Sequence, residues 1–376
     1  MFHRLISMLL VALSSSATLA SGHTPQEASP SAKKSLEGLL AEYNAGVEDI
    51  RKEMLKVMAP KRVAEKLWVE GPLQRLAHFA PRFLDLARQY PRTDVAWEAL
   101  RWIVYVRGFS EQDKAVALER MLRDHMGDQQ FSKDLYFHLH RPGVDPEKFY
   151  RRVLEHPDAP RRVAGLARFS LAESLKQQGG DKAEAEAVRL FQEVRKGFAD
   201  LPHPFDQQRG TLGNAAELAQ FEIEHLQLGR LAPDIIGADV DGKRFGLSDY
   251  HGKVVMLVFC GDWCVPCRSL YPHEEKIAEK YCEQPFAIVG VNSDSPETLR
   301  SAIEREKFRF RWFSDGSTSG PISTRWNVQT WPTIYVLDAE GKIRMKKVGA
   351  AEPEQIDLMI EQLLAEADRA KDESSD

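Results

Sequence analysis

Hydrophobic residues recur at helical spacing from about residue 36 to residue 229. Between residues 79 and 90, apolar side chains recur at the offsets that place them on one face of an amphipathic helix. A Tyr-Pro pair ends this helix, and Thr93 is placed to cap the next one, which is expected over residues 94–106. The pattern therefore predicts an all-α region over residues 36–229.

Two later segments of this region, 161–178 and 181–198, form a clearer helical pair that is separated by Gly179 and Gly180. Small and apolar residues recur along both segments, and in this they resemble one imperfect tetratricopeptide hairpin. No period of about 34 residues, which that repeat would give, recurs elsewhere in the region. A helical bundle without repeat ancestry therefore stays open as the alternative.

From residue 231 the pattern changes to short apolar runs separated by Asp-Gly and His-Gly turns. The run Val254–Cys260, "VVMLVFC", is apolar without interruption, which is typical of a central strand covered on both faces. Helices are expected from residue 265, after a Ser-Pro cap at 295–296 and over 352–364. Further strands are expected over 286–294, 309–315 and 333–338, and residues 339–349 are expected to form a turn and an edge strand. This order predicts an α/β domain over residues 231–366.

Both ends of the chain differ from these two regions. In residues 1–22 a hydrophobic run is followed by small residues, which is typical of a cleaved secretory signal peptide. The run is shorter than the ~20 apolar residues that span a bilayer, but an uncleaved signal that tethers the protein to a membrane stays open. Residues 23–35 are expected to form a flexible leader and residues 367–376 a charged tail. The protein is therefore expected to be secreted or periplasmic, where disulfides persist.

Composition and charge narrow the classes of function. The 376 residues are 43% hydrophobic and 28% charged, as in soluble globular proteins. The formal net charge of −5 and the absence of a basic run argue against nucleic acid as a partner. Four cysteines are too few to hold together a disulfide scaffold of this size.

Three of those cysteines fall within "FCGDWCVPC", directly after the predicted central strand. Cys264 stands at the start of a predicted helix, where free N–H groups and the helix dipole favour a thiolate over a thiol. Cys264 is therefore the expected nucleophile. Cys267, one turn further, is placed to attack a mixed disulfide and resolve it. Pro266 fits the first helical turn, where its missing N–H has no consequence.

These residues resemble the thioredoxin superfamily. The match consists of "WCVPC" at 263–267, Pro272, and "TWPT" at 330–333, followed by a last strand, a glycine and a helix. The Val-Pro pair between the cysteines and the preceding hairpin sequence are similar to the TlpA/ResA-like branch of that superfamily. The resemblance extends over residues 231–365. It implies a thioredoxin-like fold with a central mixed sheet flanked by helices.

The resemblance also implies roles for individual residues. Pro332 corresponds to the family's cis-proline, which packs beside the active disulfide and presents backbone to an extended substrate. Trp263 corresponds to the tryptophan that covers the active site, and Thr330 and Trp331 are expected to shape the substrate groove. The expected supporting residues are those between the cysteines and in the helix after them: Val265, Pro266 and Pro272.

The chain departs from the family pattern at the proton acceptor. Thioredoxins carry a buried acid six residues before the first cysteine, where this chain has Val258, and an aromatic residue where this chain has Cys260. The base that deprotonates Cys267 is therefore unassigned. Asp262 and Glu274 are candidates because they lie near it in the sequence.

Other uses of the cysteines are less well supported by their spacing. A structural zinc site needs four ligands, and Cys260 is predicted inside a buried strand, so no metal is expected. A peroxidase would need Thr or Ser at position 261, which is glycine. Cys260 and Cys282 are expected to be small buried hydrophobic residues, with a second redox pair as the alternative.

The sequence thus predicts an extracytoplasmic thiol-disulfide oxidoreductase that reduces substrates through Cys264 and Cys267, with the helical domain selecting partners. No cofactor beyond the Cys264–Cys267 disulfide is expected. The expected partners are protein disulfide or dithiol substrates, a membrane or envelope dithiol that donates electrons, and a protein bound by the helical domain. The alternative is a partner-binding or tethering protein whose thioredoxin-like domain is not primarily catalytic.

Overall fold

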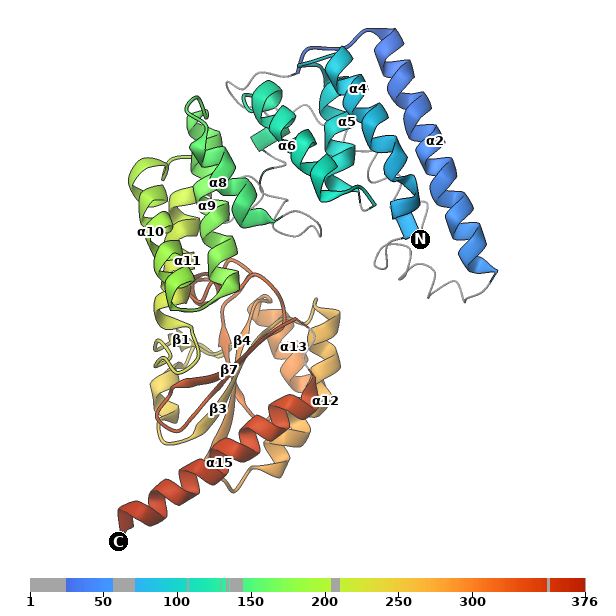
Figure 1. Ribbon diagram of the computed structural model, residues 1–376. Helices are drawn as coiled ribbons and strands as arrows, with labels where there is room; N and C mark the ends of the chain where they lie inside the picture. Colours follow the sequence, from blue (N-terminus) through green and yellow to red (C-terminus); the bar gives the residue numbers. More distant parts are fainter. Residues whose placement is uncertain are drawn as a thin grey trace. The chain divides into compact units, whose positions relative to one another are not determined.

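The computed structural model describes residues 25–56, 72–106, 108–128, 130–132, 135, 145–203, 210–349 and 352–375. The chain divides into two compact units, Met1–Ser170 and Leu171–Asp376, which are described separately (Figure 1). The predicted signal peptide, residues 1–22, lies outside the described residues, as does the start of the predicted leader. Within the ranges given above, no helix is long and apolar enough to cross a membrane.

The first unit consists of helices, as the sequence pattern predicts. They are α2 (Pro30–Leu55), η2 (Pro72–Phe79), α4 (Ala80–Gln89), α5 (Asp94–Tyr105), α6 (Glu111–His125), α8 (Pro146–Glu155) and the first part of α9 (Arg161–Gln178). Aromatic rings fill the core between α2, α4 and α5. The ring of Tyr43 packs edge-on against those of Phe79 and Trp102, with centroids 5.5 and 5.7 Å away. Thr93 caps α5 as expected, because its hydroxyl accepts a hydrogen bond from the Ala96 N–H.

The leader predicted over residues 23–35 ends earlier than expected, because α2 begins at Pro30. The Ser29 hydroxyl accepts a hydrogen bond from the Ala32 N–H at 3.3 Å and caps the helix. A serine followed by proline supplies both the cap and the first-turn residue of a helix. Gln26 also forms backbone hydrogen bonds with the chain just before α5, so this part of the segment is paired.

The second unit begins with the end of α9 and continues through α10 (Asp181–Gly197) and α11 (Leu212–His225). Gly179 and Gly180 separate α9 from α10, with φ angles of 71° and 88°. This left-handed backbone is unfavourable for residues with a Cβ, so the glycine pair ends one helix and allows the next. The helical hairpin is therefore as predicted, and its tetratricopeptide ancestry stays a prediction.

A mixed five-stranded sheet forms the centre of the second unit, in the order β5-β4-β3-β6-β7. Its strands are β3 (Val254–Cys260), β4 (Phe286–Asn292), β5 (Arg311–Ser314), β6 (Thr333–Leu337) and β7 (Ile343–Val348). The first three run parallel to one another, whereas β6 is antiparallel to β3 and to β7. A small hairpin of β1 (Ile236–Ala238) and β2 (Arg244–Gly246), followed by η4 (Leu247–Tyr250), precedes the sheet. The predicted thioredoxin-like fold is confirmed.

Both faces of the central strand are buried, as its apolar run predicts. Alternate β3 residues point to opposite faces of a sheet. Val254, Met256 and Val258 pack with helices α12 (Val265–Lys280), α13 (Pro296–Glu306) and α15 (Pro353–Ser375). On the other face, Phe259 belongs to a cluster that includes Phe221 of α11, Leu226 just after α11, and Trp326 after α14 (Pro321–Arg325). Helix α11 therefore covers part of the sheet.

Two features differ from the sequence-based prediction. The compact units divide inside α9 at Ser170, whereas the sequence pattern changes near residue 230. The cause is the apolar contact of α11 with the sheet, which local periodicity does not reveal. The charged tail expected over 367–376 is also helical through Ser375, because its alanine, glutamate and basic residues favour helix.

Candidate active site

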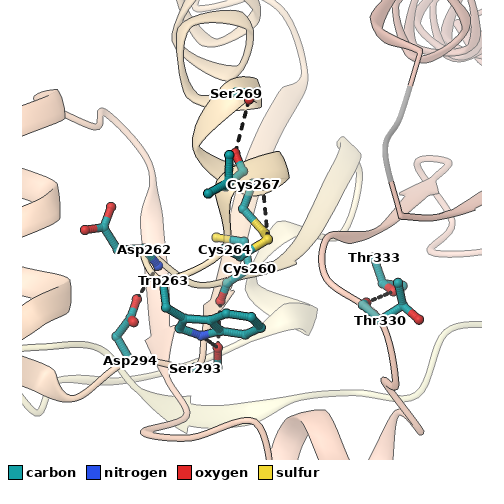
Figure 2. The surroundings of a disulfide bond; sticks show 11 residues. Cys260, Asp262, Trp263, Cys264, Cys267, Ser269, Ser293, Asp294, Thr330 and Thr333 are labelled. Atoms are coloured by element: carbon teal, nitrogen blue, oxygen red, sulfur yellow. Dashed lines mark hydrogen bonds between the residues drawn. A yellow bond between two sulfur atoms is a disulfide. The ribbon is translucent and has the colours of Figure 1, made fainter. Parts of the chain in front are cut away.

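Cys264 and Cys267 form a disulfide at the start of α12 (Figure 2). Their Cα atoms are 5.2 Å apart, and both side chains are buried. Cys264 is the N-cap residue, and its sulfur accepts a hydrogen bond from the Cys267 N–H at 3.2 Å. Free N–H groups and the positive end of the helix dipole would stabilise a thiolate at this sulfur once the disulfide is reduced.

The loop between β3 and α12 is attached to the end of β4. The Asp294 carboxylate accepts a hydrogen bond from the Asp262 N–H at 2.6 Å. The Ser293 hydroxyl donates to the Cys260 carbonyl at 3.2 Å and accepts from the Trp263 indole N–H at 3.1 Å. These bonds hold residues 260–263, immediately before the nucleophilic position.

Ser293 and Asp294 were missed by the sequence reasoning. A signal was available, because β3 and β4 are adjacent parallel strands and their carboxyl ends meet at one edge of the sheet. Polar residues directly after one such strand are therefore expected to contact the loop after the other. Gly261 belongs to the same loop, and a Cβ there would collide with the Trp263 ring and the Ser293 hydroxyl. The Thr or Ser that a peroxidase would need at position 261 would therefore clash with the Trp263 ring.

We expect Asp294→Ala to lower the free energy of unfolding by about 1–3 kcal/mol, because the part-buried Asp262 N–H loses its acceptor. The rate of disulfide reduction should fall roughly tenfold, since a misplaced loop misaligns the nucleophile. Urea unfolding and steady-state kinetics measure the two effects. Glu304→Ala, on an exposed position of α13, is the control. Equal behaviour of the two variants would contradict the role assigned to the loop contacts.

Aromatic and apolar side chains surround the disulfide. Trp263 is 54% exposed and Val265 is 62% exposed, so both present apolar surface to solvent. The ring centroids of Trp263 and Trp331 are 5.8 Å apart, and Trp331 packs against the cluster that contains both cysteines. The Trp331–Pro332 peptide bond is cis, as the family resemblance implies.

The remaining predicted residues lie on the same elements. Thr330 is exposed just before the cis bond, and its carbonyl accepts a hydrogen bond from the Thr333 hydroxyl at 2.7 Å. Pro266 is in the first turn of α12, and Pro272 lies inside that helix. The structure therefore brings the predicted cysteines, Trp263 and Trp331 together, whereas the roles of the individual residues stay predictions.

The two candidate bases differ in their surroundings. Asp262 forms an ion pair with Arg305, with 2.6 Å between carboxylate and guanidinium. Glu274 is only 1% exposed, and its Oε2 has no hydrogen-bond partner. Burial, with a smaller contribution from Glu275, raises the pKa of Glu274 to about 8, so this carboxyl is mostly protonated at neutral pH. In the disulfide form, Asp262 is therefore held by Arg305, whereas Glu274 is buried and mostly protonated.

The two other cysteines behave differently from each other. Cys260 is buried as predicted, and burial raises the pKa of its thiol well above the usual value, with Glu274 adding to the effect. Such a thiol stays protonated and unreactive. The prediction that Cys282 is buried was wrong, because Cys282 is exposed in the turn after α12. Within the described ranges, no group of three or more His, Cys, Asp or Glu is arranged to hold a metal ion.

A thioredoxin-like sheet with a Cys-x-x-Cys disulfide at a helix N-terminus defines a thiol-disulfide oxidoreductase. Residues 228–346 match the AhpC/TSA family. The thiol-disulfide oxidoreductase ResA of Bacillus cereus is 29% identical over 141 residues, which are 37% of this chain and 80% of the relative. The thioredoxin-like protein YneN of Bacillus subtilis is 31% identical over 140 residues, 36% of this chain and 80% of the relative.

Among solved structures, the thioredoxin domain of a thiol-disulfide oxidoreductase from Bacteroides vulgatus is similar, with 26% identity and a TM-score of 0.32. The alignment covers 36% of this chain and 98% of that domain. The chain belongs to the TlpA/ResA-like thiol-disulfide oxidoreductases of the thioredoxin superfamily. The family match begins at residue 228, so it says nothing about the first unit.

Proposed function

We propose that the protein works outside the cytoplasm as a disulfide reductase, with Cys264 as nucleophile and Cys267 as resolving cysteine. The observation that carries this proposal is the position of Cys264 at the N-cap of α12, with the Cys267 N–H directed at its sulfur. This arrangement favours the thiolate of Cys264 over that of the more interior Cys267. The hydrophobic N-terminal run, typical of a secretory signal, supports a location where disulfides occur.

The reaction takes two exchange steps. The Cys264 thiolate of the reduced protein attacks one sulfur of the substrate disulfide, the substrate S–S bond breaks, and the leaving thiolate takes up a proton. Cys267 then loses its proton and attacks the Cys264 sulfur of the mixed disulfide. The second substrate thiol leaves and is protonated, and the protein keeps the Cys264–Cys267 disulfide. The substrate has gained two electrons and two protons.

The next turnover needs a donor of two electrons and two protons. We propose a dithiol of a membrane or envelope protein, because exchange with a dithiol regenerates Cys264 and Cys267 without any resident cofactor. Relatives named ResA share the fold, and the Val-Pro pair between the cysteines supports the reducing direction. Trp263, Thr330, Trp331 and Pro332 would line the groove for an extended substrate.

The helical residues before the redox fold are proposed to select partners. Two observations support this: the first unit is a separate compact body, and the family match covers only residues 228–346. An extra unit on a catalytic domain can add binding surface and so restrict which proteins are reduced. This part of the proposal stands apart from the chemistry of the cysteines.

Mixed-disulfide trapping tests the proposed roles. Incubated with a disulfide-bonded peptide, reduced Cys267→Ser protein should accumulate a covalent adduct, because resolution is blocked after the first exchange. Non-reducing gels and mass spectrometry would show the adduct on Cys264. Reduced Cys264→Ser protein should form at least about tenfold less adduct, since the remaining cysteine is more interior. Equal trapping by the two variants would contradict the assignment of nucleophile and resolving cysteine.

A further inference from the structure

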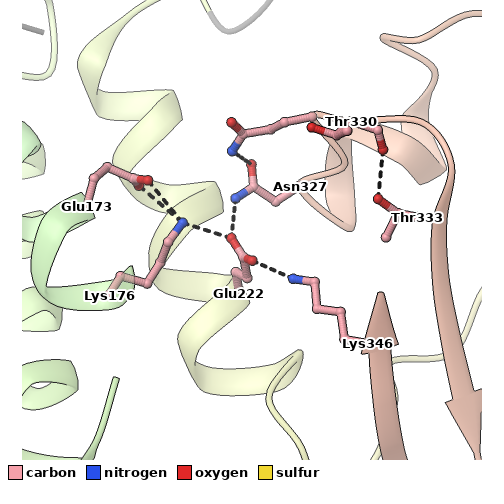
Figure 3. A network of polar contacts seen from close by, with 8 residues as sticks. Glu173, Lys176, Glu222, Asn327, Thr330, Thr333 and Lys346 are labelled. Atoms are coloured by element: carbon pink, nitrogen blue, oxygen red, sulfur yellow. Dashed lines mark hydrogen bonds and ion pairs between the residues drawn. The ribbon is translucent and has the colours of Figure 1, made fainter. Parts of the chain in front are cut away.

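A polar network inside the second unit joins its helices to the loop that precedes β6 (Figure 3). The carboxylate of Glu222, on α11, accepts hydrogen bonds from three side chains. They are the Lys176 ammonium of α9 at 2.9 Å, the Lys346 ammonium of β7 at 2.6 Å and the Asn327 amide at 2.6 Å. One carboxylate therefore connects two helices, an edge strand and a loop.

The network is largely shielded from water. The side chains of Glu222 and Lys176 are 15% and 10% exposed, and Lys176 also pairs with Glu173 at 3.1 Å. Burial acts to raise the pKa of Glu222, but the ammonium groups of Lys176 and Lys346 outweigh it and lower the pKa to about 2. Glu222 is therefore ionised at every physiological pH. A buried ion pair contributes little net stability compared with apolar packing. We therefore look for the role of this network in the geometry that it fixes.

The loop that donates the third hydrogen bond continues to Trp331, beside the cluster of the active cysteines. Asn327 adopts a left-handed backbone conformation, with φ of 51°. The loop 327–332 contains Trp331, whose indole packs near Trp263 and against the cluster of the two active cysteines. A shift at Asn327 would be passed along four residues of chain to Trp331.

We propose that Glu222 is a positioning residue, which fixes the loop 327–332 through Asn327 and so sets where Trp331 stands against the cluster of Cys264 and Cys267. Helix α11 is then part of the substrate site, although it precedes the matched redox fold in the sequence. The consequence for substrates rests on the proposed function. A peptide disulfide contacts the loop, whereas a small disulfide reagent needs only access to Cys264, so the two should respond differently.

The test uses the mature full-length chain with Glu222→Gln, which removes the charge and nearly keeps the shape. The matched control is Glu224→Gln, on the same helix but exposed. We expect the KM for a disulfide-bonded peptide to rise roughly tenfold in E222Q, as for the loss of one charge-assisted hydrogen bond, with kcat changed less than about twofold. In E222Q, the fold-loss of kcat/KM for a small aromatic disulfide should be at least about five times smaller than the fold-loss for the peptide.

E222Q could unfold, because it leaves Lys176 and Lys346 without the carboxylate that they share. A second variant covers that case. Asn327→Gly removes the amide that donates to Glu222, together with the side-chain oxygen that accepts from Gln329 at 3.5 Å, and glycine tolerates the left-handed backbone. The ion pairs of Glu222 stay in place. This variant should show the same shift in peptide KM as E222Q.

Hydrogen–deuterium exchange separates failure of this inference from failure of the proposed function, since it needs no catalysis. Amides of residues 327–332 should exchange at least about fivefold faster in E222Q and in N327G than in E224Q. Unchanged exchange in both variants would overturn the positioning role, whatever the cysteines do. Equal losses with peptide and small disulfide, together with a lower melting temperature, would also overturn it, because that is the pattern of general destabilisation.

Discussion

Replacing Cys264 by serine is expected to lower the rate of disulfide reduction at least about 1,000-fold. The reaction needs a thiolate, and a serine hydroxyl is not ionised at neutral pH and cannot form a disulfide. The N-cap geometry should survive, because serine is a favoured N-cap residue and its oxygen can accept the Cys267 N–H. Steady-state reduction of a peptide disulfide measures the loss, and circular dichroism confirms the fold.

The chain offers a matched control for this substitution. Cys282 is exposed and lies outside the redox pair, so Cys282→Ser should keep at least about half of the activity. A protein that loses its activity with Cys282→Ser, or keeps more than about a tenth of it with Cys264→Ser, would contradict the assignment of Cys264 as the reactive thiol. The two variants together therefore show whether activity depends on the thiol at the start of α12 or on any thiol of the protein.

Glu274→Gln is expected to raise the free energy of unfolding by roughly 2–4 kcal/mol at pH 8 and to change it by less than about 1 kcal/mol at pH 5. The pKa of Glu274 is raised to about 8 in the folded protein, first by burial and then by Glu275. Glutamine resembles the protonated carboxyl, which the buried site favours. Urea unfolding at a series of pH values measures the difference.

The sign of this effect follows from proton linkage. The unfolded carboxyl titrates near its usual value of 4.5, so between that pH and about 8 the folded protein binds more protons at this site than the unfolded chain. Stability therefore falls as pH rises through this window. Glu279→Gln, exposed on the same helix, should leave the profile unchanged. An E274Q profile that runs parallel to wild type from pH 5 to 8 would contradict a raised pKa at Glu274.

The active site could be predicted from the sequence because its signals are local. The uninterrupted apolar run Val254–Cys260 indicates a strand buried on both faces, and the next cysteine falls where a helix must begin. Ser295 and Pro296 likewise mark the start of α13 by cap and first-turn residue alone. Signals of this kind depend on a few neighbouring residues and not on contacts with distant parts of the chain.

Contacts between distant segments could not be predicted in this way. Phe221 lies in a regular helical pattern, which gives no sign that its partner is the face of a sheet formed more than thirty residues later. From the sequence, the adjacent Glu222 would be taken for a charged residue exposed to solvent. Only the folded structure shows its contacts with Lys346 and Asn327. The predicted division near residue 230 therefore follows a change in local pattern, whereas the compact units follow the packing.

The redox equilibrium of the mature full-length protein tests the central claim most directly. The protein would be equilibrated with a series of dithiothreitol or glutathione buffers, and its thiols counted by alkylation and mass spectrometry. We predict one cooperative two-electron transition, confined to Cys264 and Cys267, near the ~−270 mV of thioredoxin. A potential near the ~−120 mV of DsbA would contradict the reducing direction. The absence of a transition at these two cysteines would contradict the assignment of the active site itself.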